Sequence, residues 1–275
     1  MIKQKRWLTF SVLVLLSIIF LAPIFIVLMN SFKARLYISS EPFALPDSDT
    51  FAGLTNYTEG LSKTGFFSAF LLSLFITVMS VIAIVVFSSM TAWYITRVKT
   101  PLTRALYYAL VFSMVVPFQM VMYTTVKTAN VLRLDNPIGI IFIYLGFGAG
   151  LSVFMFSGFV KGIPKEIEEA AMIDGCGPIR TFFLVVFPLM KPTTITVAIL
   201  NSMWIWNDYL LPYLVIGSDY KTIPIAIQYL RGGYGSIDMG AMMAMLVLAI
   251  IPIVIFYLLC QKYIIKGVVA GAVKG

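Results

Sequence analysis

The sequence contains no histidine, only two cysteines and few charged residues, and each shortage excludes a class of protein. Without histidine the chain lacks the commonest metal ligand and the usual acid–base catalyst. Cys176 and Cys260 cannot supply a disulfide framework, and no Cys-x-x-Cys spacing occurs. Charged residues make up 12% of the chain, about half the fraction typical of soluble domains. This composition argues against an ordinary soluble enzyme.

Apolar residues are what the 275-residue chain has in excess. They make up 60% of the sequence, and the mean hydropathy is +0.95. A soluble globule of this size has too little interior to bury that much apolar surface, and disorder does not fit a chain with 15% aromatic residues. The net charge of +8 comes without a single run of Lys and Arg, which argues against a nucleic-acid-binding stripe. The composition therefore predicts a membrane protein.

Six apolar stretches are long enough to cross a bilayer, which takes about 20 residues. The first follows Lys3, Lys5 and Arg6 like a signal peptide, but it is too long and no cleavage site follows, so we expect a retained helix. One charged residue, Asp208, lies inside the six. The predicted spans are Leu8–Asn30, Phe66–Ile95, Ala105–Val126, Pro137–Val160, Thr193–Ile216 and Met239–Cys260.

The basic residues predict the orientation of these spans. With the N-terminus inside, the cytoplasmic segments carry 13 of the 20 Lys and Arg residues and the outer segments carry 7. Cytoplasmic loops are enriched in Lys and Arg, so both termini are expected inside. The predicted fold is an all-α membrane protein with six transmembrane helices. Its expected parts are residues 1–65 (first helix and external loop), 66–265 (membrane domain with the other five helices) and 266–275 (cytoplasmic tail).

Two connections are longer than turns. The polar outer segment Ser31–Gly65 is expected to form an irregular external cap. The inner segment Lys161–Pro192 is expected to form two short helices. Pro164 suits the first turn of the first helix, and Gly175 suits the position after its end. Pro178 would start the second helix, and Pro188 would interrupt or bend it.

The first of these helices has an apolar face that contains small residues. Ile163, Ile167, Ala170 and Ala171 share this face at helical spacing, and Glu166, Glu168 and Glu169 favour the positive N-terminal end. Such a face either receives a partner protein or packs against its own bundle, and the residues alone do not separate the two.

The same segment resembles the EAA loop of binding-protein-dependent ABC importer permeases. Glu169-Ala170-Ala171, three residues, Gly175, nine residues, Val185, one residue and Phe187-Pro188 match the family pattern, with Val and Phe where the family has Ile and Leu. Trp206-Asn207-Asp208-Tyr209 and the ending 266–275 are similar to the smaller six-helix permease of the maltose-type, carbohydrate-uptake branch.

The resemblance implies partners and sites. It implies a bacterial cell-membrane subunit that works with a second homologous permease, a dimeric cytoplasmic ATPase and an extracytoplasmic sugar-binding protein, and that needs no cofactor or metal. The chain has no phosphate-binding Gly-x4-Gly-Lys-[Ser/Thr] motif, so ATP hydrolysis would belong to another chain. The implied coupling residues are Glu168, Glu169, Ala170, Ala171, Asp174, Gly175 and Pro188. The implied ATPase-contacting tail residues are Gly271, Ala272 and Lys274.

The fifth span carries a polar face. Asn201, Trp204 and Asp208 follow i, i+3, i+7 spacing, and Asn207 lies beside them. An ionisable residue inside a membrane marks a functional site by default, so these four residues are candidates for a sugar translocation pathway. The structural alternative, which we favour, is that Asn207 and Asp208 cap backbone loosened before Pro212 or bind the neighbouring permease.

Two other classes of function are weaker. An ion-coupled carrier of a small polar solute would need ionisable groups near the midplane of the membrane, and the single aspartate of the spans lies away from that midplane. An intramembrane enzyme would need more than a lone carboxylate. Within the importer class, the sequence does not name the cargo.

Overall fold

The computed structural model describes residues 2–217, 219–230 and 237–272 of the chain. In these residues every named element is a helix, and an isolated antiparallel bridge joins Lys33 to Phe51. The all-α prediction is therefore confirmed for the described part of the chain.

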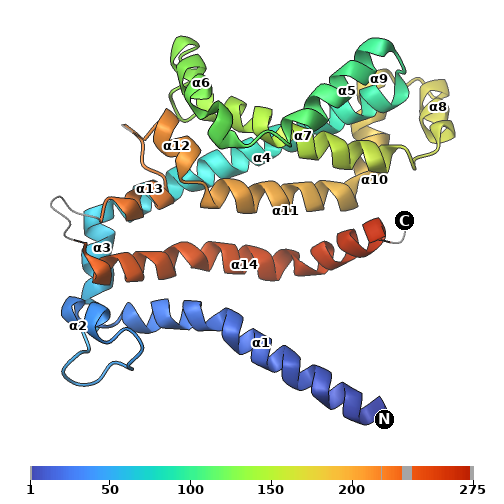
Figure 1. The fold of residues 1–275 in the computed structure, drawn as a ribbon. Helices are drawn as coiled ribbons and strands as arrows, with labels where there is room; N and C mark the ends of the chain where they lie inside the picture. Colours follow the sequence, from blue (N-terminus) through green and yellow to red (C-terminus); the bar gives the residue numbers. More distant parts are fainter. Residues whose placement is uncertain (1, 218, 231–236, 273–275) are drawn as a thin grey trace. The chain divides into compact units, whose positions relative to one another are not determined.

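The helices follow one another along the whole described sequence (Figure 1). In chain order they are α1 (Ile2–Asn30), α2 (Arg35–Ser40), α3 (Thr55–Thr64), α4 (Phe66–Arg97), α5 (Pro101–Ser113), α6 (Phe118–Val131), α7 (Gly139–Val160), α8 (Lys165–Ile173), α9 (Pro178–Thr181), the π-helix η1 (Phe182–Val186), α10 (Phe187–Leu189), α11 (Lys191–Asn207), α12 (Leu210–Val215), α13 (Ile223–Gln228) and α14 (Met239–Ala272).

Four helices are long and apolar enough to cross a membrane. They contain the stretches Thr9–Asn30, Phe66–Arg97, Gly139–Val160 and Met239–Tyr263, close to the first, second, fourth and sixth predicted spans. The count rises to six if each of two bent helix pairs is one span. The pairs are Pro101–Ser113 with Phe118–Val131, and Pro178–Leu189 with Lys191–Asn207.

The third predicted span is not one straight helix. The chain bends by 109° between α5 and α6, and Pro117 adopts an extended conformation with φ −62° and ψ 137°. Proline lacks an N–H and disfavours helical backbone in the residue before it. The stretch Ala105–Val126 is therefore two helices joined at a sharp bend, which hydropathy does not reveal because it measures apolar length and not the path of the axis.

The fifth predicted span is interrupted as well. Helix α11 ends at Asn207, Asp208 is extended with ψ 122°, and α12 starts at Leu210. The break precedes Pro212 by four residues, where proline removes the N–H that would bond the Asp208 carbonyl. A single helix over Thr193–Ile216 is therefore wrong, while the predicted loosening before Pro212 is confirmed.

The chain folds into two compact units, of which the larger comprises residues 70–224 and 255–275. Its centre is α7, which packs against α5 and α11. Tyr144 and Phe156 on α7 are fully buried. A β-carbon on Gly148 would lie 2.5 Å from the Ile84 side chain, and one on Gly150 would lie 2.6 Å from the Leu110 carbonyl oxygen. Gly148 and Gly150 therefore allow neighbouring helices to pack closely against α7.

The smaller unit comprises residues 1–69 and 225–254. A buried polar cluster lies just after α1, where Lys33 donates from Nζ to the Glu41 carbonyl at 2.6 Å. The Asn56 amide on α3 donates to the carbonyls of Ser31 and Lys33 at 2.9 and 2.8 Å. The outer segment Ser31–Gly65 thus contains α2 and α3, and the expectation that it is irregular is wrong because these backbone and side-chain hydrogen bonds order it.

Candidate functional site

The loop between α7 and α11 folds much as its prolines and glycine predict. Helix α8 starts directly after Pro164, with Glu166 and Glu168 in its first turn. Gly175 follows its end with φ +86°, the left-handed conformation that glycine adopts without steric cost. Pro178 is the first residue of α9. The bend predicted at Pro188 lies two residues later, where the chain turns by 80° between Leu189 and Lys191.

The centre of this loop is the carboxylate of Glu168, which is only 5% exposed. Arg97, the last residue of α4, donates to Oε1 from Nη2 at 2.6 Å and from Nε at 2.9 Å. The Trp93 indole on the same helix donates to Oε2 at 3.0 Å. Arg97 also donates from Nη2 to the Ile163 carbonyl at 2.9 Å. Both carboxylate oxygens are thus satisfied, and α8 is fastened to the end of α4.

The apolar face predicted on α8 divides between two directions. Ile163 is buried in the hydrophobic core of the larger unit, and Ala171 is buried beside Glu168. Ile167 and Ala170 are exposed. The two alternatives that the sequence left open therefore both apply in part: Ile163 and Ala171 pack against the protein's own helices, beside the buried Glu168 ion pair, and Ile167 and Ala170 stay open.

An exposed apolar surface nevertheless continues from α8 into α9. Ile173 is 86% exposed and Ile179 is 69% exposed, with Ile167 and Met172 also largely open. Glu169, Ala170 and Asp174 lie among them and are exposed. We call Ile167, Met172, Ile173 and Ile179 the α8 surface. Clustered exposed apolar side chains rimmed by polar residues are typical of a protein contact.

Three of the candidate residues of the fifth span, Asn201, Trp204 and Asp208, contact α7. The Asp208 carboxylate accepts at Oδ1 from the backbone N–H groups of Leu210 at 3.0 Å and Leu211 at 3.4 Å, and so caps α12. Its Oδ2 accepts from the Tyr144 hydroxyl at 3.1 Å. The Trp204 ring lies edge-on to the Tyr144 ring, with centroids 5.5 Å apart. Asp208 is therefore occupied by structural hydrogen bonds.

Asn201 and Asn207 point in different directions. Asn201 is buried and donates from Nδ2 to the Ser152 hydroxyl on α7 at 3.2 Å and to the Val197 carbonyl at 2.9 Å. Asn207 is exposed and donates to the Met203 carbonyl of its own helix at 2.7 Å. Asn201, Trp204 and Asp208 do share one face, but that face packs on α7, whereas Asn207 and part of Trp204 are open.

The predicted tail residues differ in how far they can be placed. Gly271 and Ala272 form the end of α14, so the helix continues through most of the predicted tail. Lys274 lies outside the described residues.

Sequence reasoning missed three partners of these candidates. Arg97 and Trp93 precede Glu168 by 71 and 75 residues, and Tyr144 precedes Asp208 by 64. The position of Arg97 at the end of an apolar stretch was a sequence signal, because an arginine there can form an ion pair with an acidic residue of a loop. No sequence signal paired the other two.

The fold and the loop are those of a helical protein that crosses the membrane several times and has a helical loop outside it. Residues 84–269 match the sequence model of the family described as "Binding-protein-dependent transport system inner membrane component". The chain belongs to this family. It is accordingly a multi-pass membrane protein of the bacterial inner membrane and the permease component of an ABC transporter.

Relatives resemble the chain along its whole length. It is 42% identical over 272 residues to the "Probable starch degradation products transport system permease protein AmyC" of Thermoanaerobacterium thermosulfurigenes, covering 98% of this chain and 97% of that protein. It is 34% identical over 263 residues to the "Multiple sugar-binding transport system permease protein MsmG" of Streptococcus mutans, covering 94% and 93%.

A solved structure shares the fold. It is described as the "Crystal structure of a bacterial ABC transporter involved in the import of the acidic polysaccharide alginate". The similarity has a TM-score of 0.77 at 21% identity and covers 95% of this chain and 96% of that chain.

Proposed function

We propose that this chain is one of two permease subunits of an ATP-driven importer of a sugar, with an oligosaccharide as the cargo. The observation that supports an oligosaccharide as the cargo is the full-length similarity to permeases named for starch degradation products and for multiple sugars. Its partners in this proposal are a second homologous permease, a dimeric cytoplasmic ATPase and an extracytoplasmic sugar-binding protein. The chain itself would catalyse no reaction.

The proposed topology has six transmembrane segments with both termini inside. Each bent helix pair then counts as one crossing, which brings the candidate spans to six. The 13-to-7 division of basic residues supports this orientation, and it places the loop 161–192 in the cytoplasm. The proposed membrane domain covers 66–265, preceded by 1–65 and followed by the tail 266–275.

Cysteine labelling from outside the cell tests this topology. After Cys176 and Cys260 are replaced by serine, a cysteine placed at Asp49 or Asp219 should react with an impermeant maleimide. One at Lys99 or Lys274 should react only after the membrane is opened. Labelling in the opposite sense would overturn the orientation and, with it, the coupling role of α8.

The proposed coupling mechanism starts at the α8 surface. A cytoplasmic ATPase would dock there and on Glu169, Ala170 and Asp174, and its closure on ATP would displace α8. Because Glu168 joins α8 to Arg97 and Trp93 at the end of α4, that displacement would be transmitted directly to a membrane-spanning helix. Gly175 fixes the turn after α8, and the bend next to Pro188 directs the chain back into the membrane.

In this proposal the polar residues of the fifth span stabilise the packing of the helices that line the pathway. Asp208, Asn201 and Tyr144 are used in contacts between α7, α11 and α12. Of the four candidate residues, Asn207 and Trp204 are the exposed ones. These two would face either the sugar or the second permease, whereas Asp208 would act through the backbone that it caps.

Uptake into proteoliposomes tests the proposed function. The chain, reconstituted with the second permease and the ATPase of its importer, should accumulate labelled maltooligosaccharide only with ATP on the ATPase side and with the loaded binding protein outside. A protonophore should leave the initial rate unchanged. Uptake without ATP that collapses with the proton gradient would instead support an ion-coupled carrier.

A further inference from the structure

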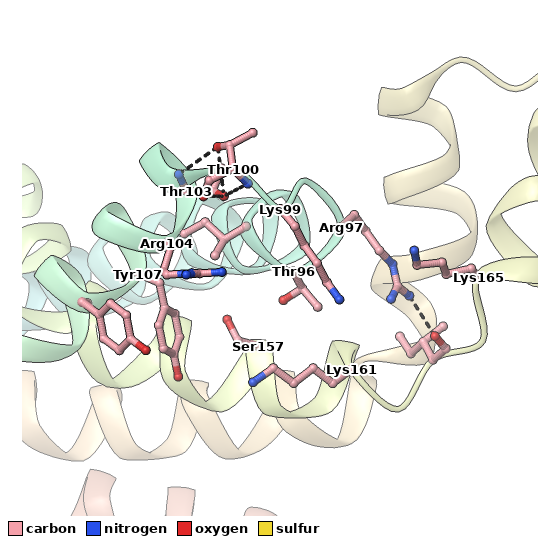
Figure 2. Close-up of a pocket in the computed structure, with 13 residues that line it drawn as sticks. Thr96, Arg97, Lys99, Thr100, Thr103, Arg104, Tyr107, Ser157, Lys161 and Lys165 are labelled. Atoms are coloured by element: carbon pink, nitrogen blue, oxygen red, sulfur yellow. Dashed lines mark hydrogen bonds between the residues drawn. The ribbon is translucent and has the colours of Figure 1, made fainter.

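A pocket of about 590 Å³ lies where α4, α5 and α7 end or begin and α8 starts. Its lining is strongly basic and contains no acidic residue. Figure 2 shows Arg104 and Lys99 reaching into the space from one side and Lys161 from the other. The five basic residues of the lining are Arg97, Lys99, Arg104, Lys161 and Lys165.

Among the described residues, one of these five cations has a carboxylate partner. Arg97 pairs with Glu168 at 2.6 Å. Within the residues that the structure describes, no carboxylate lies within ion-pair distance of Lys99, Arg104, Lys161 or Lys165. Four like charges around one pocket repel one another, and an anion between them would remove that repulsion.

A buried hydroxyl in the same pocket is the second observation that points to a ligand. Ser157 on α7 is 1% exposed and lines the pocket, and its Oγ has no hydrogen-bond partner in the described structure. A buried hydroxyl without a partner destabilises the structure, because it has lost its hydrogen bonds to water. An acceptor oxygen in the pocket would satisfy it, whereas Thr100 and Thr103 in the lining already cap α5.

The pocket lies at the level where a membrane meets water. Arg97 ends the candidate span of α4, and Val160 ends that of α7 one residue before Lys161. Tyr107 and Tyr108 complete the lining, and tyrosine is enriched at this level of membrane proteins. From Tyr108, which is 63% exposed, an open apolar track continues along α5 to Phe112, which is 68% exposed.

We propose that this pocket binds the phosphate headgroup of an anionic phospholipid such as phosphatidylglycerol. Arg104, Lys99 and Lys161 surround the phosphate, and Ser157 donates a hydrogen bond to one of its oxygens. The acyl chains lie along Tyr108 and Phe112. This apolar track favours a lipid over free phosphate, and basic pockets between membrane helices are suited to anionic headgroups. The site depends on membrane insertion and not on the identity of the cargo.

Lipid binding to the full-length protein tests this proposal. The chain is purified in neutral detergent, stripped of lipid and titrated with phosphatidylglycerol or phosphatidylcholine, and bound lipid is counted by native mass spectrometry. The variants are Arg104→Gln, Lys161→Gln and Ser157→Ala. The matched control is Lys191→Gln, an exposed base outside the pocket at the start of α11. A parallel titration uses inorganic phosphate alone.

We expect wild type to retain phosphatidylglycerol in preference to phosphatidylcholine. Each charge variant should bind it about fivefold more weakly, as expected for one lost cation at a membrane surface, and Lys191→Gln should bind as wild type does. Ser157→Ala should also bind more weakly, and its small change keeps the test valid if a charge variant misfolds. Equal retention of both lipids, an equal loss in Lys191→Gln, or displacement of the lipid by millimolar phosphate would overturn the proposal.

Discussion

The Arg97 guanidinium and the Glu168 carboxylate form a nearly buried ion pair, with Nη2 2.6 Å from Oε1 and side chains 15% and 6% exposed. The pair joins the end of a membrane-spanning helix to the helix proposed to receive the ATPase. Removing one member of a buried pair leaves the other charge without compensation. The proposed coupling therefore depends on this connection.

Replacing Glu168 should release α8 from α4. In Glu168→Gln, Arg97 keeps an amide acceptor but loses its counter-charge, and we expect the protein to lose about 3 kcal/mol of stability. ATPase co-purification should fall with it. Thermal unfolding in detergent measures the first effect. The matched control is Glu166→Gln, an exposed residue two positions earlier; if both variants unfold alike, the ion pair does not hold the loop.

Two glycines of the loop allow a controlled test of backbone strain. Gly175 has φ +86° and Gly177 has φ −69°, and an added β-carbon would meet no atom within 4 Å at either position. Gly175→Ala should therefore cost about 1–2 kcal/mol through the left-handed backbone alone, and Gly177→Ala should cost almost nothing. We expect ATP-driven uptake to fall in the first variant only. Equal uptake by both would show that the turn at Gly175 does not position α8.

Substitution of Asp208 should lower the stability of the protein and leave its preference among sugars unchanged. Asp208→Ala removes a helix cap worth about 1 kcal/mol and leaves the buried Tyr144 hydroxyl without its acceptor, at about 1–3 kcal/mol. Asp208→Asn keeps one acceptor oxygen and should lose less. Thermal unfolding and uptake of several sugars are measured on the same preparation, with Asn207→Ala as the exposed control. Selective loss of one sugar by a variant as stable as wild type would assign Asp208 to the pathway.

A surface contact in the smaller unit should respond to acid. Lys63 on α3 lies 2.7 Å from Asp238 and 2.6 Å from Glu59, and the hydrogen bond to Asp238, with that to Glu59, raises the pKa of Lys63. Partial burial opposes ionisation of Asp238, but the hydrogen bonds from Lys63 and the Ala241 N–H hold its pKa below the ordinary value.

The direction of the pH effect follows from these shifts. Because the pKa of Asp238 is lower when folded, its contribution is present above about pH 4 and is lost as pH falls through the folded value. Because the pKa of Lys63 is raised, its contribution is lost only as pH rises beyond about 10.5. Asp238→Asn should thus lower the melting temperature more at pH 7 than at pH 3. Glu59→Gln, which removes the more exposed partner of Lys63, serves for comparison; an equal effect of Asp238→Asn at both pH values contradicts the assignment.

The sequence predicted those features of the site that depend on local backbone chemistry. Pro178 starts a helix and Gly175 adopts a left-handed conformation because each residue limits or frees its own backbone. The side-chain partners of Glu168 and Asp208 were not predicted, because they come from segments more than 60 residues away. The size of the bend near Pro117 could not be predicted, because an apolar stretch has the same composition whether its helix is straight or bent.

Photo-crosslinking at Ile173 tests the central claim most directly. A benzophenone side chain at this position, which is 86% exposed on the α8 surface, should crosslink to the ATPase subunit in the assembled importer. The yield should change when ATP is bound and trapped. The same group at Leu36, 82% exposed on the predicted outer side, should give no such product. Absence of the ATPase from the Ile173 product, or an equal yield from Leu36, would contradict the account.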